Sequence, residues 1–255
     1  MSTIFGEVPY PIRSDLDEAT RKAWEYLGQP GSWWTGSERT AFVAEVRVAR
    51  DCRLCADRVD ALSPISVQGE HDTASDLPAV AIEATHRLTN DAARLSEKTI
   101  REWNAAGLTD GAYVEIVSIV STVMGIDAFC DALEIPLLPV PQAEPGEPSR
   151  YLPVKAVDDG AWVRMIPPDG VGESDAGLYD RIPGPRVPNV IRAMSLVPDA
   201  VRNLLDLLLP FYLGNLVHPE AGNSLDLGQI ELVAPPRIRC QRVLLLNDRA
   251  HTQAP

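Results

Sequence analysis

One stretch constrains the fold of this chain more than any other: residues 35–62, TGSERTAFVAEVRVARDCRLCADRVDAL. Its apolar residues recur at the spacing of a helix that buries one face, a pattern formed by Phe42, Val46, Ala49, Cys52, Val59 and Leu62. Thr35 or Ser37 can cap the start of this helix, and Pro64 marks its end. We therefore predict one long helix that carries both Cys52 and Cys55.

These two cysteines stand in a C-x-x-C spacing. On a helix, residues i and i+3 share a face, so the two thiols can form a disulfide with little backbone movement. Such a pair can exchange electrons with a peroxide or with another dithiol. Two small buried hydrophobic residues would produce the same spacing, and both interpretations stay open. No second Cys or His pair stands at ligand spacing, so the sequence predicts no metal site and, in particular, no zinc.

The remaining periodicities predict an all-α fold. Helical patterns cover residues 14–27, 76–88, 96–106, 110–133, 188–196 and 198–213, a last one starts near Leu225, and almost nothing resembles a strand before Arg239. Residues 136–185 are rich in Pro and Gly, which indicates an extended linker over the surface, pinned by Tyr151 and Trp162. We divide the chain into an arm (1–34), a helical half with the C-x-x-C (35–135), the linker (136–185), a truncated second half (186–234) and a divergent tail (235–255).

Charge and composition exclude several classes of function and binding partner. The 255 residues carry a formal net charge of -13, which argues against binding to nucleic acid or to an anionic membrane. There is no run of eighteen apolar residues and no signal-peptide pattern, so we expect a soluble cytoplasmic protein. Four cysteines in a chain of this length do not indicate a disulfide framework. Neither G-x-G-x-x-G nor a P-loop occurs, so no nucleotide cofactor is expected.

Several motifs together resemble the alkylhydroperoxidase D and carboxymuconolactone decarboxylase superfamily. They are CRLC at 52–55 with the helix before it, HRLTND at 86–91 and GAYVEIV at 111–117, while PNVIRAMS at 188–195 resembles the opening of a second, related half. The resemblance covers about two thirds of the chain and is closest to the two-halved, peroxidase-related branch. It implies an AhpD-like helical bundle of two related halves, assembled as a homo-oligomer (trimer or hexamer), for which the apolar 204–213 helix is a candidate interface.

In that family the site consists of a Glu twelve residues before the C-x-x-C and a His four residues after it. The second Cys attacks the peroxide and the first resolves the sulfenic acid, while Glu and His relay protons. Matched residue by residue, the resemblance makes Cys55 the attacking thiol and Cys52 the resolving one. Thr40 occupies the Glu position and Val59 the His position, so this chain departs from the pattern at both relay residues.

Substitutes for the relay are available in the first half. Glu45 lies two turns before the C-x-x-C, and His86 follows Glu83 at i+3, so a Glu–His pair could point toward the thiols. The alternatives are a solvated Glu45 and a His86 that interacts with the helix dipole. Glu115 lies on a core-like helix, where we expect it to be a buried partner for an Arg.

The second half approaches the family site and then loses it. In QIELVA at 229–234, Glu231 falls at the relay position, but Pro235 and Pro236 would break the helix that should continue. Read one base later, the codons from Pro235 onward permit a cysteine at the position of Val243 and a codon at Leu246 that some family members read as selenocysteine. We hypothesise a +1 frameshift near codon 234 or 235, with a diverged tail as the alternative. In either case Glu231 belongs to a vestigial site, and the mass of the C-terminal peptide decides between them.

Three functions follow. The first is a thiol peroxidase or disulfide reductase that acts through Cys52 and Cys55 on a peroxide or small molecule, with an external dithiol as reductant. The second is decarboxylation or lactone chemistry on a small acid, using Arg47, Arg50 and His86, with inert cysteines. The third is a non-enzymatic helical oligomer that serves as a scaffold.

Overall fold

The computed structural model describes residues 3–8, 11–182 and 186–213. Within these ranges the chain forms helices and no strand beyond one isolated bridge between Val157 and Met165, so the predicted all-α class is confirmed. The helices are α1 (Ser14–Gly28), α2 (Gly36–Ala49), α3 (Arg53–Asp60), α4 (Ala79–Asp91), α5 (Glu97–Ala105), α6 (Asp110–Ala132), α7 (Asn189–Met194) and α8 (Pro198–Leu213). Four short 3-10 turns join them at Pro64–Ser66, Ala92–Arg94, Pro168–Gly170 and Glu173–Asp175.

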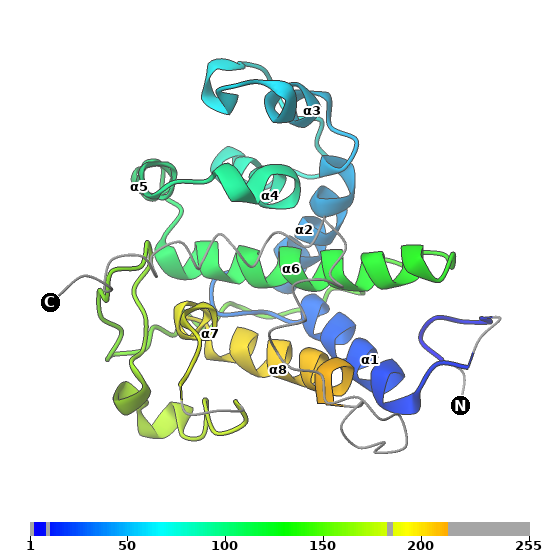
Figure 1. Cartoon of the computed structure of the whole chain (residues 1–255), viewed down its shortest axis with the longest axis vertical. Helices are drawn as coiled ribbons and strands as arrows, with labels where there is room; N and C mark the ends of the chain where they lie inside the picture. The colour runs from blue at the N-terminus through cyan, green and yellow to red at the C-terminus, as the bar shows by residue number, and fades with distance from the viewer. Residues whose placement is uncertain (1–2, 9–10, 183–185, 214–255) are drawn as a thin grey trace, which may run out of the picture.

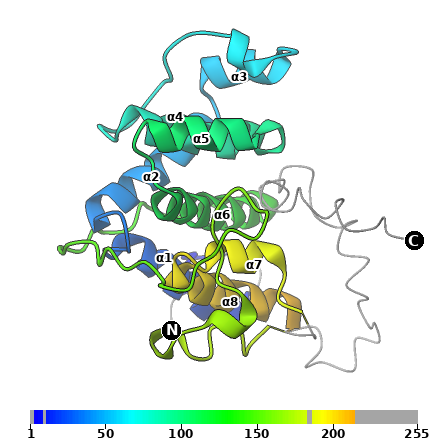
Figure 2. The same cartoon turned by 90° about the vertical axis from the view of Figure 1, so that its left-hand side faces the viewer.

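The helices form layers on either side of α6, which crosses the middle of the molecule (Figures 1 and 2). On one side lie α4 and α5, with α3 beyond them at the far end of the long axis. On the other side lie α1, α7 and α8, and α1 packs extensively on α8. Helix α2 contacts α1, α4 and α6 and so connects these layers. This arrangement places α3 at an end of the molecule, with α4 as its main neighbour.

Helix α6 is the core of the bundle. Its length and apolar composition would suffice to cross a membrane, but 72% of its most apolar window is buried inside the fold. Its contacts with α2, α4, α7 and α8 account for that composition without a membrane. Side-chain caps fix the helix starts: Thr35 forms a capping box with Glu38 at α2, and Ser96 and Thr109 cap α5 and α6.

The single helix predicted for residues 35–62 is broken. Helix α2 ends at Ala49, Cys52 adopts an extended conformation (φ -65°, ψ 123°), and α3 begins at Arg53. Side chains from elsewhere satisfy the freed backbone groups: Asn90 donates to the carbonyl of Ala49 at 2.7 Å, and Asp72 accepts from the N–H of Arg53 at 3.0 Å. The break is therefore stabilised by residues outside the stretch.

The break also redirects the second part of the predicted stripe. The first part of the stripe is buried as expected, at Phe42, Val46, Ala49 and Cys52, but Val59 is 45% exposed and Leu62 is fully exposed. Because α3 starts with a new direction, the apolar register of α2 does not continue into it. The prediction that these two residues are buried was wrong.

The predicted linker is extended, as expected, but it does not stay on the surface. Its first part runs beside the α1–α2 connection, where the N–H of Ser149 donates to the carbonyl of Gly31 at 3.0 Å. Its middle enters the core through four buried residues: Val163, Met165, Ile166 and Leu178. The hydroxyl of Tyr151 donates to Asp175 at 2.6 Å and Trp162 packs on the core, so both aromatic residues fix the linker.

The helices that open the predicted second half are present as α7 and α8. Their buried residues belong to the same core cluster as those of α1 and α6. The helix expected from Leu225, with Glu231 and the tail, lies outside the described residues. The division into two related halves therefore stays a prediction.

Candidate functional site

Both cysteines lie where α3 begins, and two histidines meet them there. Cys52 is the N-cap residue of α3 and Cys55 lies in its first turn. His71 comes from the polar segment between α3 and α4, and His86 from the middle of α4. The packing of α3 on α4 thus brings together residues from the start of α3, the α3–α4 segment and α4.

The distances in this group are short. The Nδ1 atom of His71 lies 3.5 Å from the sulfur of Cys52 and 3.6 Å from that of Cys55. The Nδ1 atom of His86 lies 3.4 Å from the sulfur of Cys55. The two imidazole rings stack at a tilt, with centroids 4.2 Å apart. We call these four residues the Cys–His cluster; their sulfur and nitrogen ligand atoms all lie within 4.8 Å of one another.

Each histidine is held from behind by a carboxylate. The Nε2 atom of His86 lies 3.2 Å from Glu45, and the Nε2 atom of His71 lies 2.8 Å from Glu83. If each Nε2 donates to its carboxylate, the Nδ1 lone pair of both rings faces the sulfurs. The cluster is therefore two Cys–His–Glu chains that share one centre.

The carboxylates are themselves positioned by further contacts. Glu83 accepts from the guanidinium of Arg58 at 2.8 and 3.0 Å, which ties α3 to α4. Glu45 accepts from the N–H of Ala74 at 2.8 Å and from the hydroxyl of Ser75 at 2.6 Å, which ties α2 to the segment that carries His71. These contacts connect α2, α3, α4 and the segment that carries His71 around the site.

All four predicted site residues of the first half meet here: Cys52, Cys55, His86 and Glu45. Glu45 and His86 are completely buried, so the alternative of a solvated Glu45 is excluded. The expected partnership is altered, because Glu83 pairs with His71 and Glu45 with His86. The second-half residue Glu231 lies outside the described residues.

Sequence reasoning missed His71. It stands in a polar, aperiodic segment, and no second His follows it at the three-to-five-residue spacing that paired histidines of a zinc site show. The prediction of no zinc rested on the lack of a second Cys or His pair at ligand spacing. In the folded chain, His71 and His86 form such a pair from two separate segments.

The surroundings act differently on the two thiols. Burial acts to raise the pKa of Cys52, but the backbone N–H groups of Cys55 and Asp72 and the ring of His71 lower it overall. Burial, together with the negative charge of Cys52, raises the pKa of Cys55 to about 12. The first thiol therefore ionises more readily than the second.

The pKa values of the two histidines and of Glu83 are also shifted by their surroundings. Burial acts to lower the pKa of His71, but its contacts with Glu83 and Cys52 raise it overall. Burial and the neighbouring His71 lower the pKa of His86, despite Glu45. Although burial acts to raise it, the pKa of Glu83 is lowered to about 2 by His71 and Arg58. His71 and Glu83 therefore favour their charged forms, whereas His86 favours its neutral form.

The residues proposed for small-acid chemistry do not share a site. Arg47 and Arg50 pair with the buried Asp127 at 2.9 and 3.7 Å, and Arg50 also pairs with Asp131 at 3.5 Å, so two carboxylates already neutralise the two positive charges. His86 instead contacts Cys55 and Glu45. These ion pairs therefore give the proposed small-acid chemistry no structural support.

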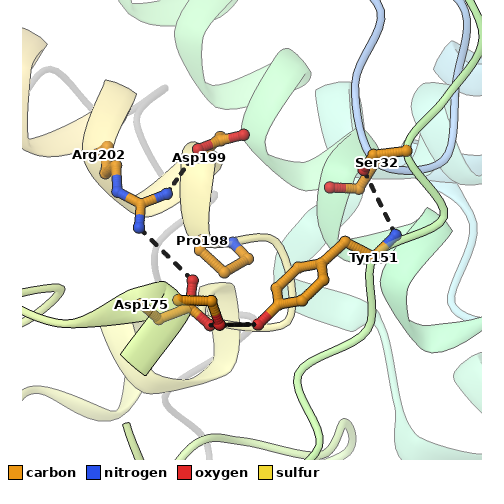
Figure 3. Close-up of a pocket in the computed structure, with 8 residues that line it drawn as sticks. Ser32, Tyr151, Asp175, Pro198, Asp199 and Arg202 are labelled. Atoms are coloured by element: carbon orange, nitrogen blue, oxygen red, sulfur yellow. Dashed lines mark hydrogen bonds and ion pairs between the residues drawn. The ribbon is translucent and has the colours of Figure 1, made fainter. Parts of the chain in front are cut away.

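Two other features lie away from the cluster. Glu115 is the buried partner of an Arg, as expected, and that Arg is Arg39. A surface hollow of about 230 Å³ lies between the linker and α8 (Figure 3). Its polar groups pair with one another, since Arg202 bonds Asp199 at 2.6 Å and contacts Asp175 at 3.5 Å. Neither cysteine lines this hollow.

Comparison of the chain with protein-family models, with curated proteins and with solved structures gave no match.

Proposed function

We propose that this chain is an alkylhydroperoxidase-like dithiol redox protein that reduces a small peroxide, or a disulfide, through Cys52 and Cys55. One observation carries the proposal: two neighbouring thiols each contact an imidazole, and each imidazole is held by a carboxylate. Thiol catalysis requires a thiolate nucleophile and a base or acid within hydrogen-bond reach, and a thiol of lowered pKa beside an imidazole supports this chemistry.

We assign the attack to Cys52, which reverses the order implied by the family resemblance. Cys52 is the N-cap residue of α3, where the helix dipole favours a negative sulfur, and His71 lies 3.5 Å from it. The lowered pKa of Cys52 and the raised pKa of His71 support a thiolate–imidazolium pair. Cys55 beside a neutral His86 is suited to the resolving step.

The reaction balances with these groups. The Cys52 thiolate attacks the terminal oxygen of ROOH, the O–O bond breaks, and His71 gives its proton to the leaving alkoxide, so that ROH and a sulfenic acid form. Cys55 then passes its proton to His86 and attacks the Cys52 sulfur. The S–O bond breaks, hydroxide leaves with the proton from His86 as water, and a Cys52–Cys55 disulfide remains. An external dithiol returns two electrons and two protons.

Access favours small substrates. The cysteines are only 1% and 4% exposed, and the segment that carries His71 covers them. We further propose, from charge and resemblance, a cytoplasmic homo-oligomer that binds neither nucleic acid nor membrane.

The test is to treat the reduced, metal-free protein with hydrogen peroxide and cumene hydroperoxide and to locate the products by peptide mass spectrometry. We expect a Cys52–Cys55 disulfide in the parent chain and a dimedone-trapped sulfenic acid at Cys52 in Cys55→Ser. Cys52→Ser should form no sulfenic acid. Cys130→Ser, which removes another buried free cysteine, is the matched control and should behave like the parent.

Two outcomes would change this conclusion. A sulfenic acid at Cys55 in Cys52→Ser would reverse the order of attack and keep the function. Thiols in the cluster that react no faster than Cys130 would overturn the redox function and favour the scaffold.

A further inference from the structure

We propose that the reduced chain binds one zinc ion in the Cys–His cluster, with Cys52, Cys55, His71 and His86 as its four ligands. This inference goes beyond the redox function, because zinc binding requires neither a peroxide nor a disulfide. It rests on the positions of the four ligand atoms and of the carboxylates of Glu83 and Glu45, which contact the two histidines.

The ligand spacing is that of a tetrahedral site. With a Zn–S distance of about 2.3 Å and a Zn–N distance of about 2.0 Å, tetrahedral angles place sulfur and nitrogen about 3.5 Å apart. The three close sulfur–nitrogen separations in the cluster are 3.4, 3.5 and 3.6 Å. All six separations stay within 4.8 Å, so small side-chain adjustments bring every ligand to one ion.

The groups behind the histidines prepare both rings for a metal. A zinc-bound His commonly donates its other N–H to a carboxylate, which fixes the tautomer and raises the basicity of the ligand nitrogen. Here Nε2 of His71 meets Glu83 at 2.8 Å and Nε2 of His86 meets Glu45 at 3.2 Å. Both Nδ1 atoms then direct lone pairs to the point that the sulfurs also face.

The donor set selects the kind of metal and the kind of site. Two thiolates with two imidazoles in tetrahedral geometry favour zinc over the oxygen-seeking Mg²⁺ and Ca²⁺. Four protein ligands leave no open position for a substrate, and three of them are buried. The ion would therefore hold α3 and the His71 segment onto α4 rather than activate a bound water.

Zinc and the disulfide exclude each other, because the ion needs both sulfurs as thiolates. The reduced chain can hold the metal, and the Cys52–Cys55 disulfide cannot. This exclusion makes the two proposals separable: metal binding is measured on the reduced protein without peroxide, and peroxide reactivity on the metal-free protein.

The experiment uses the full chain, reduced with a phosphine and freed of metal with a chelator. Zn²⁺ is titrated in competition with 4-(2-pyridylazo)resorcinol, and Co²⁺ is added separately as a spectroscopic probe. We expect one Zn²⁺ per chain, tetrahedral Co²⁺ d–d bands and thiolate-to-cobalt charge transfer. Formation of the disulfide should abolish all three.

Variants assign the ligands. Cys52→Ser and His71→Ala should lose the parent cobalt spectrum, whereas Cys130→Ser should keep it. Glu83→Gln should weaken Zn²⁺ binding by about 10- to 100-fold, because it disturbs the orientation and basicity of His71. Circular dichroism verifies that each variant is folded, and the spectrum of the parent chain tests the site even where a variant does not fold.

Three results would overturn the proposal. The first is a folded, fully reduced parent chain that does not compete for Zn²⁺. The second is a cobalt spectrum that is octahedral or lacks charge transfer from sulfur. The third is a folded His71→Ala variant with the parent spectrum and the parent affinity.

Discussion

The buried ion pair between Arg39 and Glu115 offers the sharpest test of how this fold is held together. Both side chains are 1% exposed, and they join α2 to α6. Glu115 also accepts from the N–H of Trp33 at 2.7 Å, and Arg39 donates to the carbonyl of Tyr26 at 2.9 Å. Burial raises the pKa of Glu115 in spite of Arg39, which indicates that desolvation of the carboxylate outweighs the attraction.

From these contacts we expect strong coupling between the two residues. Removing one partner leaves an uncompensated buried charge, so Arg39→Met or Glu115→Gln alone should cost about 3–5 kcal/mol of unfolding free energy. Gln at position 115 can still accept from Trp33, and Met fills much of the guanidinium volume. The double variant should therefore cost only about 1–2 kcal/mol, the worth of the lost hydrogen bonds.

The pH dependence of Arg39→Met has a defined sign. Without the cation, Glu115 keeps a folded-state pKa above its unfolded value. The folded state then binds the proton more tightly, so the penalty is present at pH above the folded pKa and shrinks as pH falls toward the unfolded value. The variant should therefore recover stability relative to the parent as pH falls from the raised folded-state pKa of Glu115 to its unfolded value.

Urea unfolding followed by tryptophan fluorescence measures all four corners of this cycle. The exposed pair of Glu18 and Lys22, one helical turn apart on α1, is the control, and Glu18→Gln should change stability by less than about 0.5 kcal/mol. Single variants that cost under about 1 kcal/mol, or a double variant that costs the sum of the singles, would refute the reasoning.

Three further predictions concern the ends and the packing of helices. Thr35→Ala removes the capping box of α2 and should cost about 1 kcal/mol in urea unfolding; no change would mean that the cap is redundant. Gly111→Ala should destabilise by about 1–3 kcal/mol, because its Cβ would lie 2.2 Å from Nε1 of Trp33. Gly125→Ala on the same helix has open space and should stabilise by about 0.5–1 kcal/mol, so equal effects would contradict this argument. Arg94 donates to carbonyl groups at the end of α3, so Arg94→Ala should speed amide exchange in α3 several-fold and leave α6 unchanged.

The sequence by itself determined the local features of this protein. Apolar periodicity and a cap such as Thr35 located the helices, because both signals act within a few residues. The spacing of Cys52 and Cys55 identified a pair of neighbouring thiols, and the lack of alternation excluded a sheet. These features need no knowledge of which segments meet.

Only the tertiary structure decided what surrounds the two thiols. The break between α2 and α3 depends on Asn90 and Asp72, which lie far along the chain from Ala49 and Arg53. His71 comes from an aperiodic segment whose position is fixed by contacts rather than by local propensity. No periodic pattern in the sequence therefore predicts where its side chain lies. Burial of a charged residue such as Glu45 is likewise decided by its partners, because an isolated carboxylate favours water and a satisfied one can lie in the core. The surroundings of the two thiols thus depend on the packing of segments that are distant in the sequence. The two sulfurs themselves are predicted as neighbours by the C-x-x-C spacing alone.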